Sequence, residues 1–314
     1  MSSRQPSVTV VICVYQQREF LPWVLTALRA QDYQGSWEIV VCDDGSSEDM
    51  LSIVKQDAPT MPVRIRYIWQ PDVGFTLSAS RNNAIRCAVS DLLIFIDGDI
   101  VVPTDFVRQH VAAHDGKPRL ISGSRKYLFL SKYPDLDVPQ LLAESRYDEL
   151  SRYGKFPSSI FQDARAAGGD PWLGIIGCNF SVWRSQSVFF DESFVGWGVE
   201  DTEYAIRLWN RHGYSIDVQT SIGVYHLERT MPGLFDPCRP QTPKEIELYI
   251  KNIVRLTDLF PDLELEAIWR ELLLFDYNSE DGRWLRASCH YKRDLNEVRA
   301  TALAWVDGQR SLAS

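Results

Sequence analysis

The sequence has no run of apolar residues approaching the roughly 20 that a membrane-spanning helix needs, and residues 1–7 are short and polar. This start does not match a secretory signal peptide, which has a longer apolar core behind basic residues. The six cysteines lie far apart, without the close pairs typical of zinc or redox sites. These absences predict a cytoplasmic protein without a transmembrane segment. Peripheral membrane association and the oligomeric state stay open.

The chain also lacks an excess of basic residues. The chain carries 33 Lys and Arg against 42 Asp and Glu, a net charge of −9, whereas a nucleic-acid binder needs a basic surface. The first predicted strand is followed by Tyr15-Gln16-Gln17-Arg18 and not by Gly-x-Gly-x-x-Gly, and no Walker-type phosphate loop occurs. The sequence therefore disfavours nucleic-acid partners, dinucleotide-dependent dehydrogenases and P-loop enzymes.

The first hundred residues alternate between β-branched apolar runs and amphipathic segments. The apolar runs predict strands at 8–14, 38–42, 63–69 and 92–96, and the amphipathic segments predict helices at 18–31 and 76–89. This alternation predicts an α/β fold with a mostly parallel sheet flanked by helices. Ligands bind beyond the carboxyl ends of such strands. Polar residues gather just past those ends, namely Tyr15, Asp43, Asp44, Asp97 and Asp99.

An Asp-x-Asp motif, Asp97-Gly98-Asp99, ends the last of these strands. Two carboxylates one residue apart at a strand end can approach one hard cation and a ribose hydroxyl. A bound divalent ion neutralises a departing diphosphate as a Lewis acid. The tripeptide could also be a solvated turn, but the apolar residues on both sides favour the functional interpretation.

A lone histidine, His226, lies in the apolar segment 223–227. Such a histidine is often a core residue. Here it follows a predicted strand of the same sheet, and an imidazole combined with a carboxylate and diphosphate oxygens suits Mn²⁺ well. The other four histidines are expected to be surface or structural residues.

The most informative segment is Gly196-Trp197-Gly198-Val199-Glu200-Asp201, just before a predicted helix that ends near Gly213. Acidic residues at a helix start are favoured by the helix dipole by roughly 0.3–1 kcal/mol each. The same field keeps Asp201 ionised, as a general base must be. Helix capping needs neither glycine, so we expect the backbone to approach a ligand there, with the indole lining a sugar pocket.

Several prolines follow Arg229, and helical periodicity resumes at Lys244. We therefore expect a catalytic domain over residues 1–238, with a nucleotide half to about 105 and an acceptor and metal half from about 106. Residues 239–314 are expected to form a helical extension whose apolar face packs on the domain. Residues 126–170 look irregular and are a candidate lid or acceptor-facing insertion.

Together these motifs resemble family 2 glycosyltransferases of the GT-A fold, a Rossmann-like α/β architecture. The carboxyl-terminal half is similar to that of β-1,4-galactosyltransferases, chondroitin polymerases and polypeptide N-acetylgalactosaminyltransferases. The resemblance covers about residues 7–229. Its most specific segments are 41–46, 74–83, 97–99, 177–181 and the Gly-Trp-Gly-x-Glu-Asp cluster. Cys178 departs from the family, which usually has Gly-Gly-Asn there.

The resemblance implies roles for the matching positions. Nucleotide contacts are implied for Tyr15, Asp44, Arg81 and Asp97. Contacts with the donor or acceptor sugar are implied for Trp197, Gly198, Glu200 and Asn179. Asp99 and His226 would ligate the metal, and Asp201 would be the catalytic base. Retaining members of the broader group carry Glu-Asn where this chain has Glu200-Asp201, so inversion is implied, because direct displacement needs a base for the incoming hydroxyl.

We therefore expect an inverting glycosyltransferase that uses Mn²⁺ or Mg²⁺ and moves a sugar from a UDP-sugar to a hydroxyl of a glycan, lipid-linked sugar or peptide. Two alternatives stay open. A nucleotidyltransferase also uses paired aspartates at a strand end, but it gives the Gly-Trp-Gly cluster no role. A non-catalytic nucleotide-sugar-binding module would not need Asp99, Asp201 and His226 together.

Overall fold

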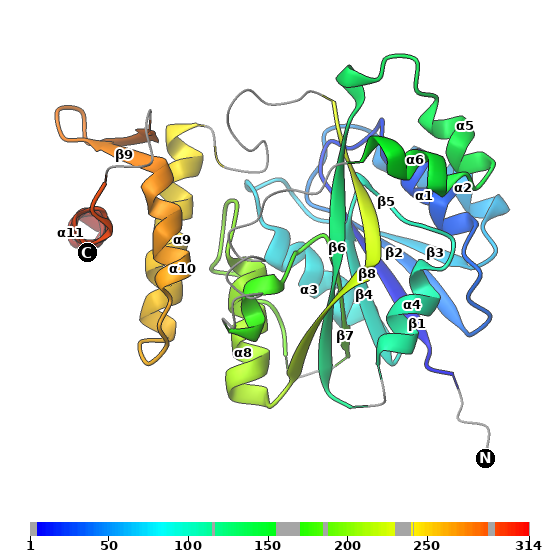
Figure 1. Ribbon diagram of the computed structural model, residues 1–314, viewed down its shortest axis with the longest axis horizontal. Coiled ribbons are helices and arrows are strands. Elements are labelled where there is room, and N and C mark those ends of the chain that lie inside the picture. The colour runs from blue at the N-terminus through cyan, green and yellow to red at the C-terminus, as the bar shows by residue number, and fades with distance from the viewer. Residues whose placement is uncertain are drawn as a thin grey trace.

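A computed structural model describes residues 5–114, 117–154, 170–184, 188–229, 240, 242–287 and 293–313. Its centre is an eight-stranded sheet with the order β3-β2-β1-β4-β7-β6-β8-β5 (Figure 1). The amino-terminal strands are β1 (Val8–Val14), β2 (Trp37–Asp43), β3 (Arg64–Trp69) and β4 (Leu92–Asp97). All four run parallel. The predicted α/β fold with a mostly parallel sheet is confirmed.

The parallel strands also share a register that brings their carboxyl ends together. Cys13 in β1 lies opposite Cys42 in β2 and Asp97 in β4. The intervening segments are α1 (Leu21–Arg29), α2 (Met50–Asp57), the 3-10 turn η1 (Ala58–Thr60) and α3 (Leu77–Cys87). Alternate residues of β1 enter two different cores, so helices cover both faces of the sheet.

The second half of the sheet mixes strand directions. Its elements are β5 (Ile100–Val101), α4 (Phe106–Ala113), β6 (Arg119–Phe129), η2 (Leu130–Lys132), α5 (Val138–Ala143), α6 (Tyr147–Tyr153), η3 (Pro171–Gly174), β7 (Asn179–Trp183), α8 (Glu200–His212) and β8 (Ser215–Glu228). The segment expected to be irregular therefore contains the end of β6 and two short helices. Its residues 155–169 lie outside the described residues.

The carboxyl-terminal extension is helical but also contains a hairpin that the sequence did not predict. It comprises α9 (Pro243–Leu259), α10 (Glu266–Arg270), η4 (Glu271–Leu274), β9 (Phe275–Asn278), β10 (Arg283–Arg286) and α11 (Leu295–Ala313). Thr242 begins α9 with a capping box completed by Glu245. In Figure 1 the extension lies at the end of the molecule away from the amino terminus, on the side of α8.

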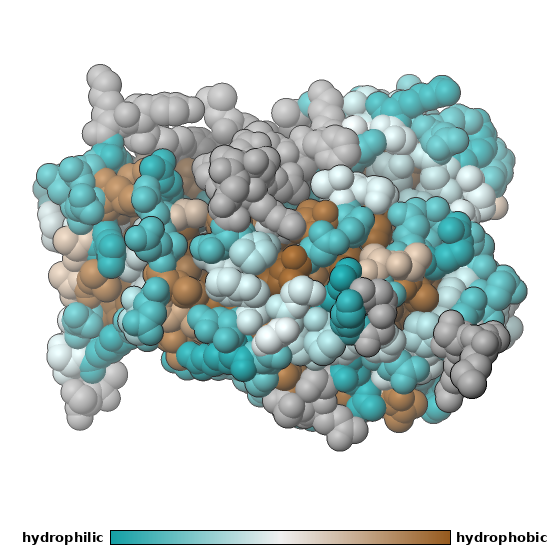
Figure 2. All heavy atoms as spheres, turned by 60° about the horizontal axis from the view of Figure 1, so that its bottom comes forward, coloured by the Kyte–Doolittle hydropathy of each residue, from teal (hydrophilic) through white to brown (hydrophobic). Residues whose placement is uncertain are grey.

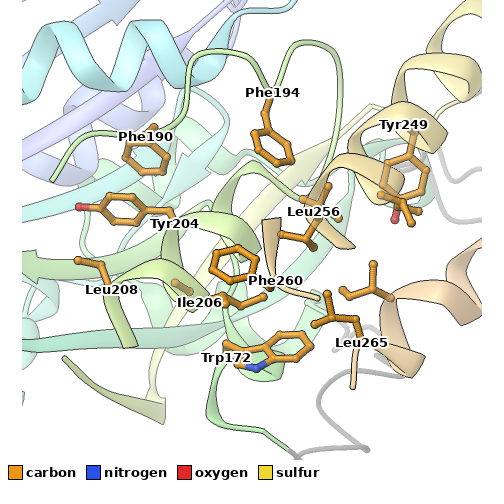
Figure 3. Close-up of a cluster of buried hydrophobic side chains, with 14 of the residues drawn as sticks. Trp172, Phe190, Phe194, Tyr204, Ile206, Leu208, Tyr249, Leu256, Phe260 and Leu265 are labelled. Atoms are coloured by element: carbon orange, nitrogen blue, oxygen red, sulfur yellow. The ribbon is translucent and has the colours of Figure 1, made fainter. Parts of the chain in front are cut away.

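The extension shares a hydrophobic core with the domain. Figure 3 shows Phe190, Tyr204 and Ile206 of the domain in one cluster with Leu256 and Phe260 of the extension. All five are buried. The face of α9 that carries Ile246, Ile250 and Ile253 is likewise buried in this core.

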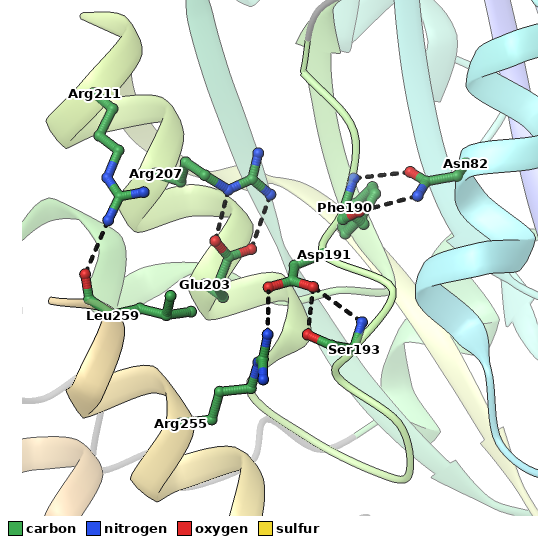
Figure 4. A network of polar contacts seen from close by, with 9 residues as sticks. All are labelled: Asn82, Phe190, Asp191, Ser193, Glu203, Arg207, Arg211, Arg255 and Leu259. Atoms are coloured by element: carbon green, nitrogen blue, oxygen red, sulfur yellow. Dashed lines mark hydrogen bonds and ion pairs between the residues drawn. The ribbon is translucent and has the colours of Figure 1, made fainter.

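Polar contacts also join α8, the loop before it and α9, as Figure 4 shows. Arg211 in α8 donates to the Leu259 carbonyl at 2.9 Å, and Arg255 in α9 lies 3.4 Å from the Asp191 carboxylate. The face in Figure 2 is mainly hydrophilic, with hydrophobic residues showing as separate areas between polar ones. In the described part of the chain, no helix combines the length and apolar character that crossing a membrane requires.

Candidate active site

A cavity of about 500 Å³ opens at the carboxyl ends of the parallel strands and reaches to the extension. The structure brings most of the predicted site residues together along its wall: Tyr15, Asp44, Arg81, Asp97, Asp99, Trp197, Gly198, Glu200, Asp201 and His226. The exception is Asn179. Segments far apart in the sequence therefore meet at a single site.

Asp44 and Tyr15 lie at one end of this cavity, just past β2 and β1. The buried Asp44 carboxylate accepts a hydrogen bond from the Thr76 backbone N–H at 2.8 Å, which anchors the start of α3. Burial raises the pKa of Asp44, although hydrogen bonds from Thr76 and Gln70 oppose the shift. Tyr15 is 45% exposed, so its ring is available to a ligand.

The Asp-x-Asp motif places its two carboxylates differently. The Asp97 side chain is about a third exposed, 3.8 Å from the Arg81 guanidinium. Asp99 lies deeper, with its Oδ1 3.6 Å from His226 Nε2. The residue after Asp99, Ile100, pairs with His226 in the sheet, which fixes this proximity. A Cβ on Gly98 would come within 2.7 Å of the Val14 side chain, so only glycine fits between the carboxylates.

The environment of Asp99 and His226 is suited to a cation. Burial raises the pKa of Asp99 to about 6, with His226 opposing the shift. Burial acts to lower the pKa of His226, but Asp99 and then Glu228 raise it above its ordinary value. Asp99 Oδ1 is a buried acceptor without a hydrogen-bond partner, and His226 Nδ1 lies 3.2 Å from Glu228.

These two residues fit a divalent ion as a partial ligand set. A carboxylate beside the far ring nitrogen orients an imidazole for metal binding, as Glu228 does here for His226. Within the described residues, no group of three or more His, Cys, Asp and Glu side chains is placed to hold a metal. The described residues therefore offer one oxygen and one nitrogen donor to such an ion.

Glu200 and Arg81 form a buried ion pair, with 3.0 Å between Oε1 and Nη1. Burial and the neighbouring Asp201 raise the pKa of Glu200 to about 7, while Arg81 opposes the shift. Arg81 also donates to the Gly177 carbonyl at 3.1 Å, and Phe190 lies under its guanidinium. Arg81 thus links the Asp-x-Asp motif to the start of α8.

Asp201 lies at the first turn of α8 and on the cavity wall, and it accepts a hydrogen bond from the Thr202 N–H at 2.7 Å. A Cβ on Gly177 would come within 2.9 Å of both Asp201 Oδ2 and Arg81 Nη2. Within Gly177-Cys178-Asn179, it is therefore the backbone of Gly177 that lies close to the Asp201 and Arg81 side chains. Cys178, the departure from the family pattern, is buried, and burial raises the pKa of its thiol to about 12.

Asn179 does not line the cavity, although the sequence analysis grouped it with the sugar contacts. Its buried side-chain amide donates to the carbonyls of Ser124 and Ile222, both at 2.9 Å, and its oxygen lies 3.0 Å from His110 Nε2. The β6–β8 register shifts between Ser122 and Ser124. Asn179 therefore bonds carbonyls beside this irregularity, where buried polar groups need partners.

The two glycines around Trp197 also meet a packing requirement that the sequence did not predict, and Gly198 lines the cavity as well. Both have positive φ, +81° at Gly196 and +95° at Gly198. A Cβ would lie 2.8 Å from the Leu248 side chain at Gly196 and 2.5 Å from the Tyr249 ring at Gly198. These glycines make room for α9, and Asn252 on the same helix donates to the Gly198 carbonyl at 3.2 Å.

Sequence reasoning missed several residues of the cavity wall, namely Gln17, Arg125, Trp172, Tyr249, Ile268 and Glu271. Gln17 donates to Asp99 at 3.2 Å, and the Arg125 guanidinium lies over Tyr127 and 3.6 Å from the Cys178 sulfur. Of these residues, Gln17 could have been predicted from its position, because it follows the end of β1 closely and strand ends line the site. The residues of the extension carry helical periodicity and no motif.

The family model described as "Glycosyl transferase family 2" matches residues 9–170, just over half of the 314-residue chain. With the α/β sheet and the site at its strand ends, this defines a transferase-type domain of the GT-A fold. The chain belongs to glycosyltransferase family 2.

Curated relatives extend the likeness beyond the family model. Validoxylamine A glucosyltransferase of Streptomyces hygroscopicus subsp. jinggangensis is 29% identical over 287 residues, covering 85% of this chain and 64% of that protein. Hyaluronan synthase of Pasteurella multocida is 27% identical over 77% of this chain and 26% of its own length. The matches thus span less than two thirds of these relatives.

Solved structures show the same fold. The mannosyltransferase PcManGT from Pyrobaculum calidifontis, in complex with GDP-Man and Mn²⁺, superposes with a TM-score of 0.57 at 17% identity, covering 82% of this chain and 65% of that chain. Residues 1–349 of S. aureus TarS in complex with UDP give 0.53 at 16% identity, covering 84% and 69%. At these identities the likeness concerns the fold alone.

Proposed function

We propose that this protein is an inverting, divalent-metal-dependent glycosyltransferase that moves a sugar from a UDP-sugar to an acceptor hydroxyl. The observation that carries the proposal is the position of Asp201. This carboxylate lies at the start of α8 on the wall of the cavity that also contains the Asp97, Asp99 and His226 side chains. A base and a diphosphate-binding group facing one cavity are what direct displacement requires.

In the proposed reaction the acceptor oxygen forms a bond to the anomeric carbon as the bond from that carbon to the diphosphate oxygen breaks. Asp201 accepts the hydroxyl proton, and the electron pair of the broken bond leaves with UDP. Asp201 lies in the first turn of α8, where the helix dipole favours a negatively charged side chain. Glu200 cannot act as freely, because it is buried against Arg81.

Asp99 and His226 are the proposed ligands of Mn²⁺ or Mg²⁺. Asp97, which lies close to them, is proposed to contact the ribose of the nucleotide. When bound, the ion supplies Lewis-acid stabilisation of the departing diphosphate. Tyr15 and Asp44 lie at the nucleotide end of the cavity and are proposed to hold the base. The complexes of TarS with UDP and UDP-GlcNAc support a UDP-sugar as the donor. Because PcManGT was solved in complex with GDP-Man, the test below also includes GDP-sugars.

The test is nucleoside diphosphate release from a panel of UDP-, GDP- and TDP-sugars, with Mn²⁺, with Mg²⁺ and with chelator. We expect metal-dependent release from a UDP-sugar. The anomeric configuration of the product, read by proton NMR against that of the donor, checks inversion. Release of pyrophosphate would point to a nucleotidyltransferase, and metal-dependent UDP binding without turnover under any condition would point to a binding module. A retained configuration would overturn the role of Asp201.

A further inference from the structure

Arg81 borders the cavity but is almost fully buried. It lies in α3, and only 1% of its surface is exposed. The Cζ atom of its guanidinium is 5.2 Å from the centre of the Phe190 ring and 5.9 Å from that of Phe180. Asn82, the next residue of α3, fixes this packing, because it exchanges two hydrogen bonds with the Phe190 backbone (Figure 4). A ligand in the cavity can therefore reach little of Arg81.

The two terminal nitrogens of this guanidinium are bound to protein atoms. Nη1 donates to Glu200 Oε1 at 3.0 Å, and Nη2 donates to the Gly177 carbonyl at 3.1 Å. Nη2 also lies 3.8 Å from Asp97 Oδ1. These partners belong to the start of α8, the turn before β7 and the end of β4. The planar fork of an arginine holds such partners in fixed directions, which the point charge of a lysine does not.

The contact with Glu200 fastens a strained helix start. Val199, just before α8, has a φ of +62° and gives the helix no side-chain cap. This left-handed conformation is an outlier for a β-branched residue, and such strain persists only where surrounding contacts hold the backbone. The ion pair with Arg81 holds Glu200, the first residue of the helix. Asp201, the next residue, is held with it.

Gly177 connects the same guanidinium to the Asp201 carboxylate. A Cβ at Gly177 would lie 2.9 Å from both Arg81 Nη2 and Asp201 Oδ2. The φ of Gly177 is not positive, so a larger residue would fail there for lack of space and not because of backbone strain. The guanidinium, the Gly177 backbone and the Asp201 carboxylate therefore pack side by side in the wall of the cavity.

We propose that Arg81 is a positioning residue of the reaction and not a nucleotide contact, the role that the resemblance to the family implies. Arg81 holds the start of α8 against the Gly177 turn and the end of β4. It thereby fixes the Asp201 carboxylate relative to the Asp-x-Asp motif. The inference rests on the proposed function, because it needs Asp201 to be the base.

The first test is Arg81→Lys. This variant keeps the positive charge, but one ammonium group cannot bond Glu200 and the Gly177 carbonyl with the geometry of the fork. We expect kcat for UDP release from the donor that the panel identifies to fall by about 10²-fold, the scale for a misplaced catalytic group, and the Kd of UDP with Mg²⁺ to change by less than about threefold. Steady-state kinetics and calorimetry measure the two. A rise in this Kd of about tenfold or more would show a nucleotide contact and overturn the proposal.

Arg86→Lys is the matched control. Arg86 lies on the same helix and pairs with Glu192, but its side chain is 50% exposed. An exposed pair of this kind contributes little, so we expect both kcat and the Kd of UDP to stay within about twofold of the unaltered protein.

A double-mutant cycle separates positioning from a general loss of structure. If Arg81 acts through Asp201, Arg81→Lys should lower kcat by less than about threefold in the Asp201→Asn protein, where the base is already absent. A general loosening of the fold would lower kcat by about 10²-fold in both backgrounds, and this additive result would overturn the proposal.

Gly177→Ala provides an independent variant if Arg81→Lys does not fold. Its Cβ would displace Arg81 and Asp201 while every charged group stays in place. We therefore expect kcat to fall by about tenfold or more, with the Kd of UDP within about threefold. Gly223→Ala is its control, since the nearest atom to a Cβ there is Ser124 Oγ at 3.5 Å. Equal kcat values for the two alanine variants would also overturn the proposal.

The unaltered protein distinguishes a failure of this inference from a failure of the proposed function. If it neither binds UDP with Mg²⁺ nor releases UDP from any donor, the proposed function fails and the inference fails with it. If it does both and Arg81→Lys keeps kcat within about threefold, only the role of Arg81 is wrong.

Discussion

At the proposed nucleotide end of the cavity, Tyr15, Asp44 and Asp97 lie at or next to the ends of parallel strands, whereas at the proposed acceptor end Trp197 packs against Tyr249 of a distant helix. The first arrangement follows from strand register, because the partners of Cys13 bring three strand ends to the same edge. The second depends on close packing between segments that meet only in the folded chain.

The largest expected effect comes from the residue where the two ends meet. Asp201→Asn keeps the shape but removes the base, so kcat should fall by about 10²- to 10⁴-fold. UDP affinity should stay within about threefold, since Asp201 belongs to the acceptor side. Steady-state kinetics and calorimetry measure the two quantities. An unaltered kcat would show that Asp201 is not the base. A loss of UDP affinity as large as the loss of kcat would show that Asp201 also takes part in nucleotide binding.

The next effect tests whether the acceptor end depends on packing. Gly198→Ala combines a positive φ with a Cβ 2.5 Å from the Tyr249 ring. Gly213→Ala serves as the control, because Gly213 also has a positive φ (+68°) but no atom within 4 Å of its Cβ. We expect a loss of about 1 kcal/mol in the free energy of unfolding for Gly213→Ala, and about 2–4 kcal/mol for Gly198→Ala, where overpacking adds to the backbone strain. Denaturant titration measures both, and equal losses would show that α9 moves away at no cost.

The sequence predicted the nucleotide end more fully than the acceptor end for a physical reason. Buried parallel strands are marked by local apolar runs, and 8–14 was predicted with the bounds that β1 has. The glycines at 196 and 198 were recognised as unusual and assigned to a ligand, whereas their close contacts with α9 were not predicted. Tyr249 was predicted only as one of several residues at helical spacing, and that spacing does not mark it as the neighbour of Gly198. Nothing local to Glu271 or Asn179 reveals that one faces the cavity and the other fills a sheet irregularity.

A smaller, pH-dependent effect is expected at the Glu200–Arg81 pair. Burial and Asp201 raise the pKa of Glu200 to about 7 in the folded protein, above its value in the unfolded chain. The protonated form is therefore favoured by folding, and this contribution is lost as the pH rises through the folded pKa. We expect the free energy of unfolding to fall between about pH 5 and about pH 8 more steeply in the unaltered protein than in Glu200→Gln. Parallel slopes in denaturant titrations would show that Arg81 fully compensates the buried charge.

The smallest effect should come from the polar contact that ties α9 to the loop before α8. The Arg255 guanidinium is 3.4 Å from Asp191 and 43% exposed, so solvent screens the pair. Arg255→Gln should therefore change the free energy of unfolding by less than about 1 kcal/mol. Ile253→Ala on the buried face of the same helix should cost about 2–5 kcal/mol. If the order of these two values were reversed, ion pairing and not the shared hydrophobic core would hold the extension against the cavity, and the acceptor end would be sensitive to salt.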